Sequence, residues 1–526
     1  AFVTYDKIFN ESHHLTATIG TTVYKTWGDH LEGRGYDVPN NSWEFADLSL
    51  TTGTSSAKAV NSWVYDQRRL SYFGRLQYDY QGRYLLSAML RRDASTKFGP
   101  DNAVAYFPSV TMGWNLTKEN FLKNSEKIDL LKLRLSYGIL GSDKIGNYRY
   151  ISQLNGEATY VFDGSLVNGT AVGASPNPAI KWEESEQFDV GADLKLFNNK
   201  VDISADYFIK KTIDLLIENI PVSGILGVGA PGAAGPTVNA GTVKNSGFEF
   251  AVGYRGNIAK DFSFSVNYNL TTLKNEVLEV NNGTGFVQGG SFGVGQPLPA
   301  RMEVGKPIGY FYGYKTDGLF QSQAEVDAHP SQIALGANAS PGDIRFVNTN
   351  NDEVIDTDDR VEIGSPIPDA TMGMNLTLNF KGFDFVAYAF ASIGNDIVRN
   401  YERVIPDVNK LSYKLDRWTG AGTSNWVPRV TTAATSNTVF SDFYVEDGSF
   451  LRLQNIQLGY TLPTGFTRRF SVQSLRLYTS ISNLFTLTDY QGYDPAASTG
   501  DPIGSGFDNG FYPAARTYTF GLNLNF

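Results

Sequence analysis

The sequence predicts an all-β protein, a transmembrane antiparallel β-barrel with long extracellular loops. The first observation is a two-residue period at the end of the chain, where Tyr518, Phe520, Leu522, Leu524 and Phe526 alternate with polar residues and glycine. Side chains alternate between the two faces of a strand, so one face would meet lipid and the other a watery lumen. The other two observations are the recurrence of this pattern and the alternation of short and long connections.

The alternation recurs in segments of about ten residues, the length of a tilted strand that crosses a bilayer. Between residues 131 and 139 apolar side chains alternate with Lys132, Arg134 and Ser136. A Lys or Arg on the lipid face would cost about 2 to 4 kcal/mol at the midplane, so charges confined to one face indicate a lipid face. A soluble β-sandwich also alternates, but the number of such segments favours the barrel. The segments are 131–139, 188–196, 201–209, 248–254, 262–270, 372–380, 475–481 and 516–526.

Composition excludes several other classes of protein. The chain has no run of about 18 apolar residues and therefore predicts no transmembrane helix. Because Cys is absent, disulfides and thiolate chemistry are excluded. The net charge of -10 argues against a nucleic-acid partner. The 29 Tyr and 34 Phe suit the aromatic girdles of a barrel.

Two kinds of connection follow one another along the chain. Outer-membrane barrels place short turns in the periplasm and long loops outside. Short connections are expected at 81–82, 198–199, 255–261 and 381–382, and long ones at 27–67, 141–183, 214–245, 277–368, 395–448 and 486–514.

The strand count predicts a missing part. If the last strand descends to the periplasm, counting back through about fifteen strands makes the first, at 2–9, descend as well. Bacterial single-chain barrels have even strand numbers and begin on the periplasmic side. We therefore expect residues 1–526 to be the C-terminal part of a longer barrel protein.

Particular residues also resemble a family. The stretch Tyr72-Phe-Gly-Arg-Leu-Gln-Tyr-Asp-Tyr-Gln-Gly-Arg-Tyr-Leu-Leu86 and the ordered segments after it are similar to the SusC/RagA family of TonB-dependent outer-membrane transporters. Those segments are 92–100, 107–109, 133–138, 181–184, 206–208, 211–212, 245–249, 447–453 and 482–485. The family's TonB box, plug domain and first strands have no counterpart in this chain.

The resemblance implies a function in nutrient uptake. It implies a 22-stranded barrel in the bacterial outer membrane, with about seven strands and the plug upstream of this chain. A SusD-like surface lipoprotein would deliver an oligosaccharide or peptide, and TonB would energise uptake through the missing N-terminal part. The implied protein is not an enzyme, and no substrate-binding residue is predicted. A passive outer-membrane porin and an outer-membrane barrel enzyme remain as alternatives.

One loop has the spacing of a calcium site. Oxygen ligands at loop positions 1, 3, 5, 7, 9 and 12 are typical of an EF-hand, because Ca²⁺ prefers six to eight oxygens. Asn at position 1 and Glu353 in place of the turn glycine depart from this pattern. We expect Ca²⁺ or Mg²⁺ here, whereas charge pairing by Arg345 and Arg360 is the rival explanation. The predicted ligands are Asn348, Asn350, Asp352, the carbonyl of Val354, Asp356 and Asp359.

Other motifs are interpreted as chance matches, and no organic cofactor is expected. The G-x-S-x-G match at 289–293 lacks the strand-to-helix setting of a nucleophile elbow. The G-x-G-x-x-G match at 227–232 has no following helix to receive a pyrophosphate. His13 and His14 should point to opposite faces of a strand and therefore bind no common metal.

Aromatic residues in or beside the long loops have two interpretations. Flat rings could stack on sugars or grip peptide side chains, or they could pack the loops against one another. Packing is the favoured interpretation. These residues are Trp27, Trp43, Trp63, Tyr310, Phe311, Tyr312, Trp418 and Trp426.

Overall fold

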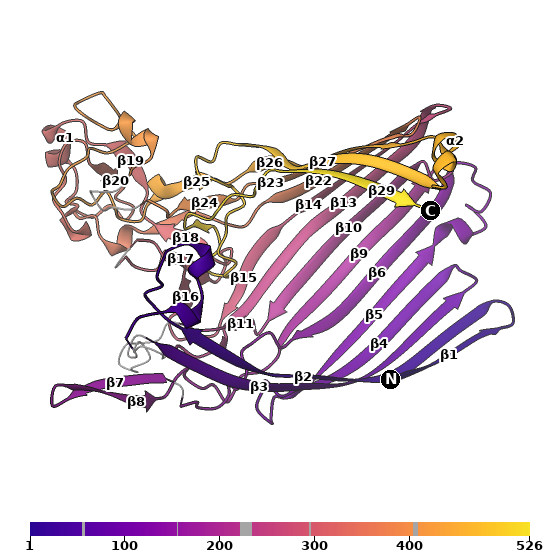
Figure 1. The fold of residues 1–526 in the computed structure, drawn as a ribbon, viewed down its shortest axis with the longest axis horizontal. Coiled ribbons are helices and arrows are strands. Elements are labelled where there is room, and N and C mark those ends of the chain that lie inside the picture. Colours follow the sequence, from indigo (N-terminus) through magenta and orange to yellow (C-terminus); the bar gives the residue numbers. More distant parts are fainter. Residues whose placement is uncertain (55–57, 155, 221–233, 294–295, 403–408) are drawn as a thin grey trace.

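The computed structural model describes residues 1–54, 58–154, 156–220, 234–293, 296–402 and 409–526. Within these ranges fifteen strands pair in chain order, each antiparallel to the next, and β15 (Lys274–Val280) adds a sixteenth by pairing with β13 (Figure 1). The fifteen strands are β1 (Phe2–Phe9), β2 (His13–Arg34), β3 (Ala59–Tyr80), β4 (Tyr84–Ser95), β5 (Val104–Asn115), β6 (Ile128–Ser142), β9 (Glu183–Leu196), β10 (Val201–Ile213), β13 (Gly241–Ala259), β14 (Phe262–Thr272), β22 (Ala370–Phe380), β23 (Phe383–Ile393), β26 (Phe450–Thr461), β27 (Ser474–Thr488) and β29 (Thr517–Asn525).

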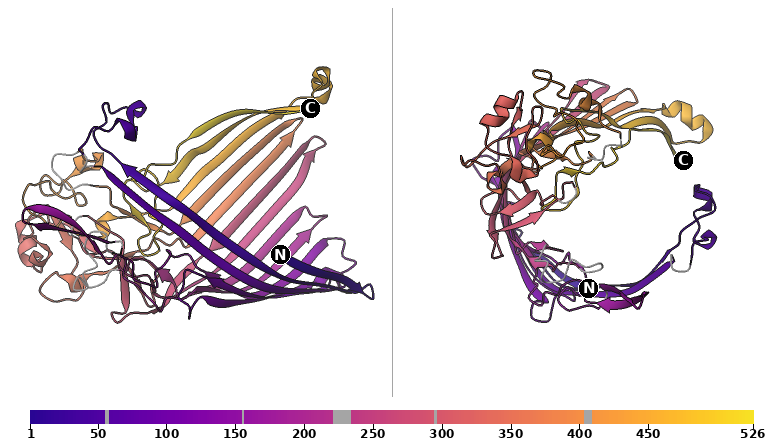
Figure 2. Two further views of the ribbon diagram at one scale, coloured as in Figure 1. Left: turned by 60° about the horizontal axis from the view of Figure 1, so that its bottom comes forward. Right: turned by 90° about the vertical axis from the view of Figure 1, so that its left-hand side faces the viewer.

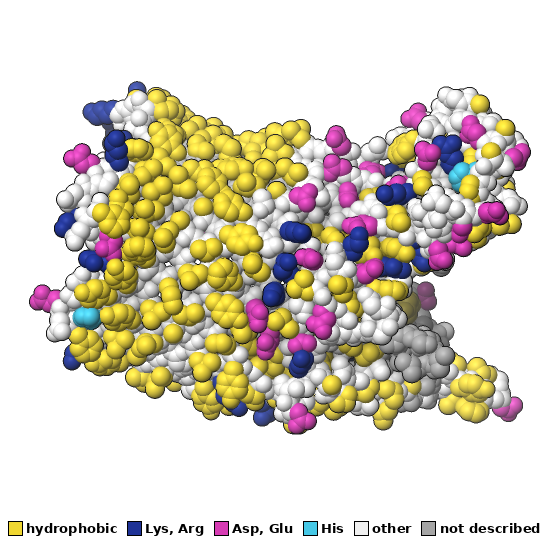
Figure 3. Space-filling model, turned by 180° about the vertical axis from the view of Figure 1, so that it is seen from behind, with side chains coloured by type: hydrophobic (Ala, Val, Ile, Leu, Met, Phe, Trp, Pro, Cys, Tyr) yellow, Lys and Arg dark blue, Asp and Glu magenta, His cyan; other side chains and the backbone are white. Residues whose placement is uncertain are grey.

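The sheet curls around an open interior, with β1 and β29 at its two margins (Figure 2). Its register keeps apolar residues on one face. Leu135 lies opposite Met112 and Val190, whereas the neighbouring Arg134 lies opposite two glycines. The apolar side chains form a broad band on the outside of the sheet (Figure 3). The predicted barrel sheet, its strand count and its lipid face are therefore confirmed.

Connections alternate between the two ends of the sheet (Figure 1). The short-turn end holds 10–12, 81–83, 116–127, 197–200, 260–261, 381–382 and 462–473. The long-loop end holds 35–58, 96–103, 143–182, 214–240, 273–369, 394–449 and 489–516.

Three predicted connections were too long, and one of them, expected at 214–245, ends at 240 because β13 begins at Gly241. The loop expected at 27–67 is only 35–58, because β2 and β3 stay paired as far as Arg34 and Ala59. The rings of His30 and Trp63 stack across this extension at 3.8 Å between centroids. The turn expected at 255–261 is reduced to 260–261, because β13 remains paired with β14 as far as Ala259.

The long loops fold into a packed body beyond the barrel (Figure 1). The side chains of Phe311, Phe346, Ile355, Val398 and Phe507 are buried together in its core. The body contains β11 (Leu216–Ile217), β12 (Val238–Asn239), β16 (Phe286–Gly289), β17 (Ala300–Glu303), β18 (Tyr310–Gly313), β19 (Thr316–Leu319), β20 (Ile344–Phe346), β21 (Val361–Gly364), β24 (Asp396–Arg399), β25 (Val445–Asp447) and β28 (Phe507–Asp508).

Smaller elements complete the fold. A hairpin of β7 (Gly156–Phe162) and β8 (Ser165–Ala171) projects from the long-loop end. The helices α1 (Gln323–Ala328) and α2 (Thr464–Thr467) are short, and no helix in the described ranges is long and apolar enough to cross a bilayer. A second core, around Phe98, Phe107, Ile180 and Trp182, lies at the junction of β5 with the loop before β9.

Candidate functional site: the lumenal wall and the body at its mouth

The lumenal wall carries an ion pair that spans three strands. Arg134 on β6 reaches across β9 to Asp206 on β10, with 2.8 Å between Nη1 and Oδ1. Its Nε also lies 2.8 Å from Oδ2 of Asp193. Gly191 lies beneath this contact, and a Cβ added there would overlap the Asp206 carboxylate. The ion pair therefore depends on the glycine.

A second ion pair repeats this arrangement further along the wall. Arg476 on β27 contacts Asp384 on β23 across β26, with 2.8 Å between Nε and Oδ1. Gly459 on β26 leaves the space that both side chains use. Opposite charges held across an intervening strand link non-adjacent strands and keep the wall polar.

The wall is hollowed near the short-turn end. A depression of about 440 Å³ is lined by Gln77, Asp79, Ser87, Thr111 and Lys132, among others. These side chains offer donors, acceptors and both signs of charge. Such a surface suits water and hydrophilic solutes.

A smaller hollow of about 210 Å³ lies where the barrel wall meets the body. Phe390 and Phe450 give it apolar sides, and Asp396 of β24 supplies a carboxylate. Burial raises the pKa of Asp396 above its ordinary value, although the Ser365 amide, which donates a hydrogen bond of 2.8 Å to Oδ2, acts in the opposite direction. An acidic group beside aromatic rings can contact hydroxyl or amine groups of a solute.

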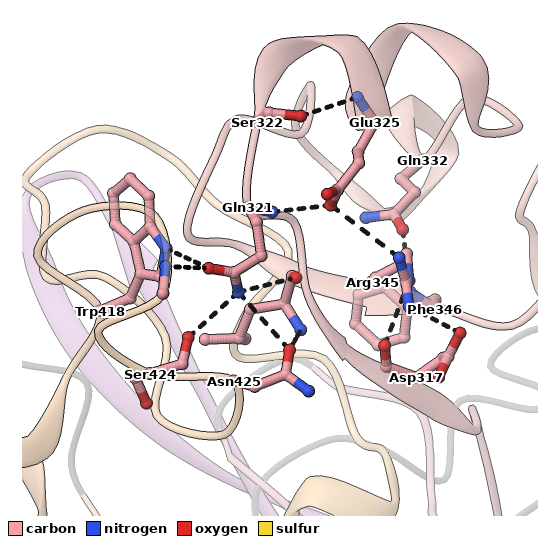
Figure 4. Close-up of polar contacts among 12 residues, drawn as sticks. Asp317, Gln321, Ser322, Glu325, Gln332, Arg345, Phe346, Trp418, Ser424 and Asn425 are labelled. Atoms are coloured by element: carbon pink, nitrogen blue, oxygen red, sulfur yellow. Dashed lines mark hydrogen bonds and ion pairs between the residues drawn. The ribbon is translucent and has the colours of Figure 1, made fainter.

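The body is tied together by Gln321 (Figure 4). Its Nε2 donates to the carbonyl of Ser424 at 3.1 Å, and its Oε1 accepts from Trp418 Nε1 at 3.2 Å and from the Gly422 amide at 2.8 Å. These bonds join the 273–369 and 394–449 connections. Arg345 pairs nearby with Asp317, at 2.8 Å between Nη2 and Oδ2.

The predicted metal loop is present as a compact segment. Oxygens of Asn350, Asp352 and Asp356 accept backbone N–H groups within the loop. Asp359 is fully buried and accepts from the Thr349 amide at 2.7 Å and the Asp356 amide at 2.9 Å.

Most hydrogen-bond partners of the six predicted ligands therefore lie within the same loop. Asn348 accepts from the Asn351 amide at 2.7 Å, and the Val354 amide donates to Asp352. In the described ranges no group of three or more His, Asp or Glu side chains is placed to hold a metal ion. Of the rival arginines, Arg345 pairs with Asp317 and Arg360 lies over the Tyr312 ring. The mixed ligand set, with its Asn and carbonyl oxygens, stays a prediction.

The other motifs have ordinary surroundings. The 289–293 match ends β16 and continues into a packed loop, where Phe292 is buried and the Ser291 carbonyl accepts from Asn400. His13 contacts Tyr78 at 2.7 Å, and His14 contacts Asp6 at 2.9 Å, so the two rings have separate partners. The match at 227–232 lies outside the described residues.

The loop aromatics divide into two groups. Tyr310 and Phe311 are buried and Trp418 is held by Gln321, as the packing interpretation expected. Trp43 is 92% exposed and Trp27 is also exposed, and these two rings stay available for contact.

Two features of the site were missed by sequence reasoning. Arg399 is buried in the body between Glu402, three residues further along the chain, and Glu446, which is 47 residues away and has no signal in the local sequence. The glycines beneath the two ion pairs, in contrast, could have been found from the sequence. Gly191 and Gly459 lie on the polar face of their strands, and the strands on either side carry opposite charges on that face.

A curved antiparallel sheet with an apolar outside and a polar lumenal wall is the architecture of an outer-membrane β-barrel, and the long loops pack into a body at one end of it. Residues 1–381 match the family model described as TonB dependent receptor-like, beta-barrel. The chain belongs to this family, and its sheet lies in the bacterial outer membrane.

Individual relatives agree with this assignment. TonB-dependent receptor P3 of Formosa agariphila is 33% identical over 535 residues, covering 100% of this chain and 52% of the relative. TonB-dependent receptor SusC of Bacteroides thetaiotaomicron is 30% identical over 513 residues, covering 94% of this chain and 46% of the relative. The chain spans about half the length of the curated relatives it matches. The resemblance to SusC is thereby confirmed, and these relatives are receptors rather than enzymes.

A solved structure gives the same fold. The RagAB peptide transporter aligns with a TM-score of 0.80 and 24% identity, covering 99% of this chain and 54% of the other.

Proposed function

We propose that this chain is part of the barrel of an importer that takes up oligosaccharides or peptides across the outer membrane. The main support is the charged lumenal wall, which carries the ion pairs of Arg134 and Arg476 across three strands each, together with the hollow where this wall meets the body. SusC-like and RagA-like relatives add support for nutrient uptake. A passive porin is less favoured, because the chain belongs to a TonB-dependent family.

The proposal includes parts beyond this chain. A plug and further strands would complete the barrel between β1 and β29, a SusD-like lipoprotein would cap the body, and TonB would act through the plug. The mass of the intact polypeptide tests the first point, and a mass near the 57.8 kDa of this chain would contradict it. Isolation in mild detergent tests the second, since repeated recovery without a lipoprotein would contradict the pairing.

Uptake by whole cells tests the function. Cells that produce the intact protein should accumulate labelled oligosaccharides or peptides from a mixed library, and loss of the protein or of TonB should abolish this accumulation. Accumulation that persists without TonB would identify a passive pore.

A substitution in the hollow between barrel and body tests whether solutes pass through it. Ala497→Trp places a large ring in the hollow between barrel and body and should reduce uptake. Ala433→Trp makes the same change at an exposed position on the same body and should leave uptake intact. Equal uptake by both variants would show that solutes do not pass through the hollow.

A further inference from the structure

The short-turn end has a charge opposite to that of the whole chain. Its seven connections contain nine Lys or Arg and four Asp or Glu, a net charge of +5 in a chain of net charge -10. Basic side chains gather at this end beside the apolar band (Figure 3). We name this set the basic rim: Arg83, Lys118, Lys123, Lys127, Lys200, Lys260, Lys381, Arg468 and Arg469.

Most of these cations are unpaired. Arg83 contacts Glu119 at 3.4 Å, but none of the other eight forms an ion pair with a carboxylate of the described residues. All eight are exposed. At the long-loop end, in contrast, Arg345, Arg399 and Arg429 are paired with carboxylates. The rim therefore presents positive charge that the protein does not neutralise itself.

Exposed apolar side chains accompany the cations. Phe121, which is 70% exposed, lies between Lys118 and Lys123 in the 116–127 connection. Phe470, which is 67% exposed, follows Arg468 and Arg469, and its ring packs against Phe466 at 5.5 Å between centroids. The same pairing recurs at Phe197 with Lys200, Ile258 with Lys260 and Phe380 with Lys381.

The connections form one continuous edge. The Phe197 amide bonds to the Lys127 carbonyl, the Lys381 amide to the Asp261 carbonyl, and the Thr461 amide to the Gly382 carbonyl. Phe380 ends a strand whose apolar residues face lipid, so the edge continues the lipid-facing band. A ring of cations and aromatic side chains at this level matches a membrane interface, where rings sit at the headgroups and cations attract anionic lipid.

We propose that the basic rim binds the phosphate groups of anionic glycerophospholipids in the periplasmic leaflet of the outer membrane. Each cation supplies a positive charge at the headgroup level, and each neighbouring ring or aliphatic side chain enters the acyl boundary. A protein partner with an acidic surface would use one patch, whereas these cations follow the edge of the lipid face from one connection to the next.

Native mass spectrometry of the intact protein tests the proposal. The protein is purified from micelles that contain equal amounts of phosphatidylglycerol and phosphatidylcholine, and the retained lipids are counted. We expect retention of phosphatidylglycerol over phosphatidylcholine. This preference should fall at high salt, because salt screens exposed charges. Equal retention of the two lipids by the wild-type protein would overturn the proposal and leave an acidic protein partner as the explanation of the rim.

A triple variant identifies the residues. Lys381→Gln/Arg468→Gln/Arg469→Gln should lower the preference by about fivefold for each cation that contacted lipid. The matched control, Lys144→Gln/Lys274→Gln/Lys315→Gln, removes three exposed cations from the long-loop end and should keep the preference. An equal loss in both variants, or no loss in the first, would refute the assignment. The salt test needs no variant and therefore decides the proposal even if a variant fails to fold.

Discussion

At the residue scale, the stability of the body depends on one buried cation, the guanidinium of Arg399. The Arg399 side chain is fully buried, 2.5 Å from Oε1 of Glu402 at its Nε and paired with Glu446 through Nη1. Rings of Tyr413 and Phe443 surround the guanidinium. A buried ion pair adds little net stability, but breaking it leaves an uncompensated charge. The cluster therefore makes the body sensitive to single substitutions.

Arg399→Ala should destabilise the body by about 3 to 5 kcal/mol, because Glu446 would remain buried without a cation and Glu402 would keep only Lys414, whose Nζ lies 3.3 Å from its Oε2. Hydrogen exchange of amides 396–447 measures the effect. Lys315→Ala, at an exposed position of the same body, serves as the control. The triple variant Arg399→Met/Glu402→Gln/Glu446→Gln should recover much of the loss, and protection in Arg399→Ala equal to that in the control would contradict the prediction.

Asp396 should make the body less stable as pH rises. Its pKa is raised above the ordinary 3.8, first by burial, so the native protein holds a proton that the unfolded chain has lost. Stability therefore falls as pH rises from near 3.8 through the raised pKa. Asp396→Asn should unfold like the wild type at pH 3 and at a higher temperature than the wild type at pH 7.

The thermal unfolding midpoint at these two pH values tests this prediction. Asp163→Asn, in the exposed turn between β7 and β8, is the control and should not change the pH dependence. A difference between wild type and Asp396→Asn that stays constant with pH would show that the effect is not ionisation.

At the element scale, strands were the predictable part of this protein. A period of two fixes which side chains share a face, so the lipid and lumenal faces of β6, β9 and β10 follow from the sequence alone. Their partners need the register, because Arg134 and Asp206 are 72 residues apart and meet only through the alignment of three strands. The body was unpredictable for the same reason: its short strands come from distant loops without a period.

Gly191→Ala should lower stability by about 1 to 3 kcal/mol, because the new methyl group would force the Asp206 carboxylate away from Arg134. Gly74→Ala is the control, since a Cβ there meets no atom within 4 Å. The denaturant midpoint of the folded barrel in micelles distinguishes them. Equal midpoints for the two variants would show that the wall tolerates the displaced ion pair.

The 348–359 loop should bind Ca²⁺ through its mixed oxygen ligands. Added Ca²⁺ is then expected to slow proteolysis of this segment, and a chelator should reverse the protection. Asp352→Asn/Asp356→Asn should abolish the response, because it removes two carboxylates from the predicted set. Asp358→Asn is the control. It changes an exposed carboxylate of the same loop that is not a predicted ligand, so the response to Ca²⁺ should remain. Proteolysis independent of Ca²⁺ in the wild type would refute the metal site.

At the scale of the whole molecule, the sheet and the body have opposite organisation. The sheet is one layer with its apolar side chains outside, whereas the body is a globule with its apolar side chains inside. Lipid stabilises the first and water the second. The last strand, β29, shows the lipid-facing pattern up to Phe526, which is itself exposed.

Phe526→Ala should lower the amount of inserted protein without changing uptake per molecule, because the terminal aromatic resembles the signal read during outer-membrane insertion. Phe520→Ala removes an equally exposed ring from the same strand and is the control. Surface immunoblots measure the amounts. Normal surface levels of Phe526→Ala would assign the terminal ring to ordinary lipid contact.

The hydrophobic core of the body includes residues from near the end of the chain. The body takes its apolar side chains from four connections, and the last of them, 489–516, contributes Ile503 and Phe507 shortly before the final strand. The Val398 amide bonds to the Gly506 carbonyl, so the 394–449 connection is completed only when that late segment arrives. The core of the body is therefore complete only when residues from all four connections lie on the same side of the bilayer. Withdrawing any one of these connections through the membrane would expose buried apolar side chains to water, so the packed body opposes that movement.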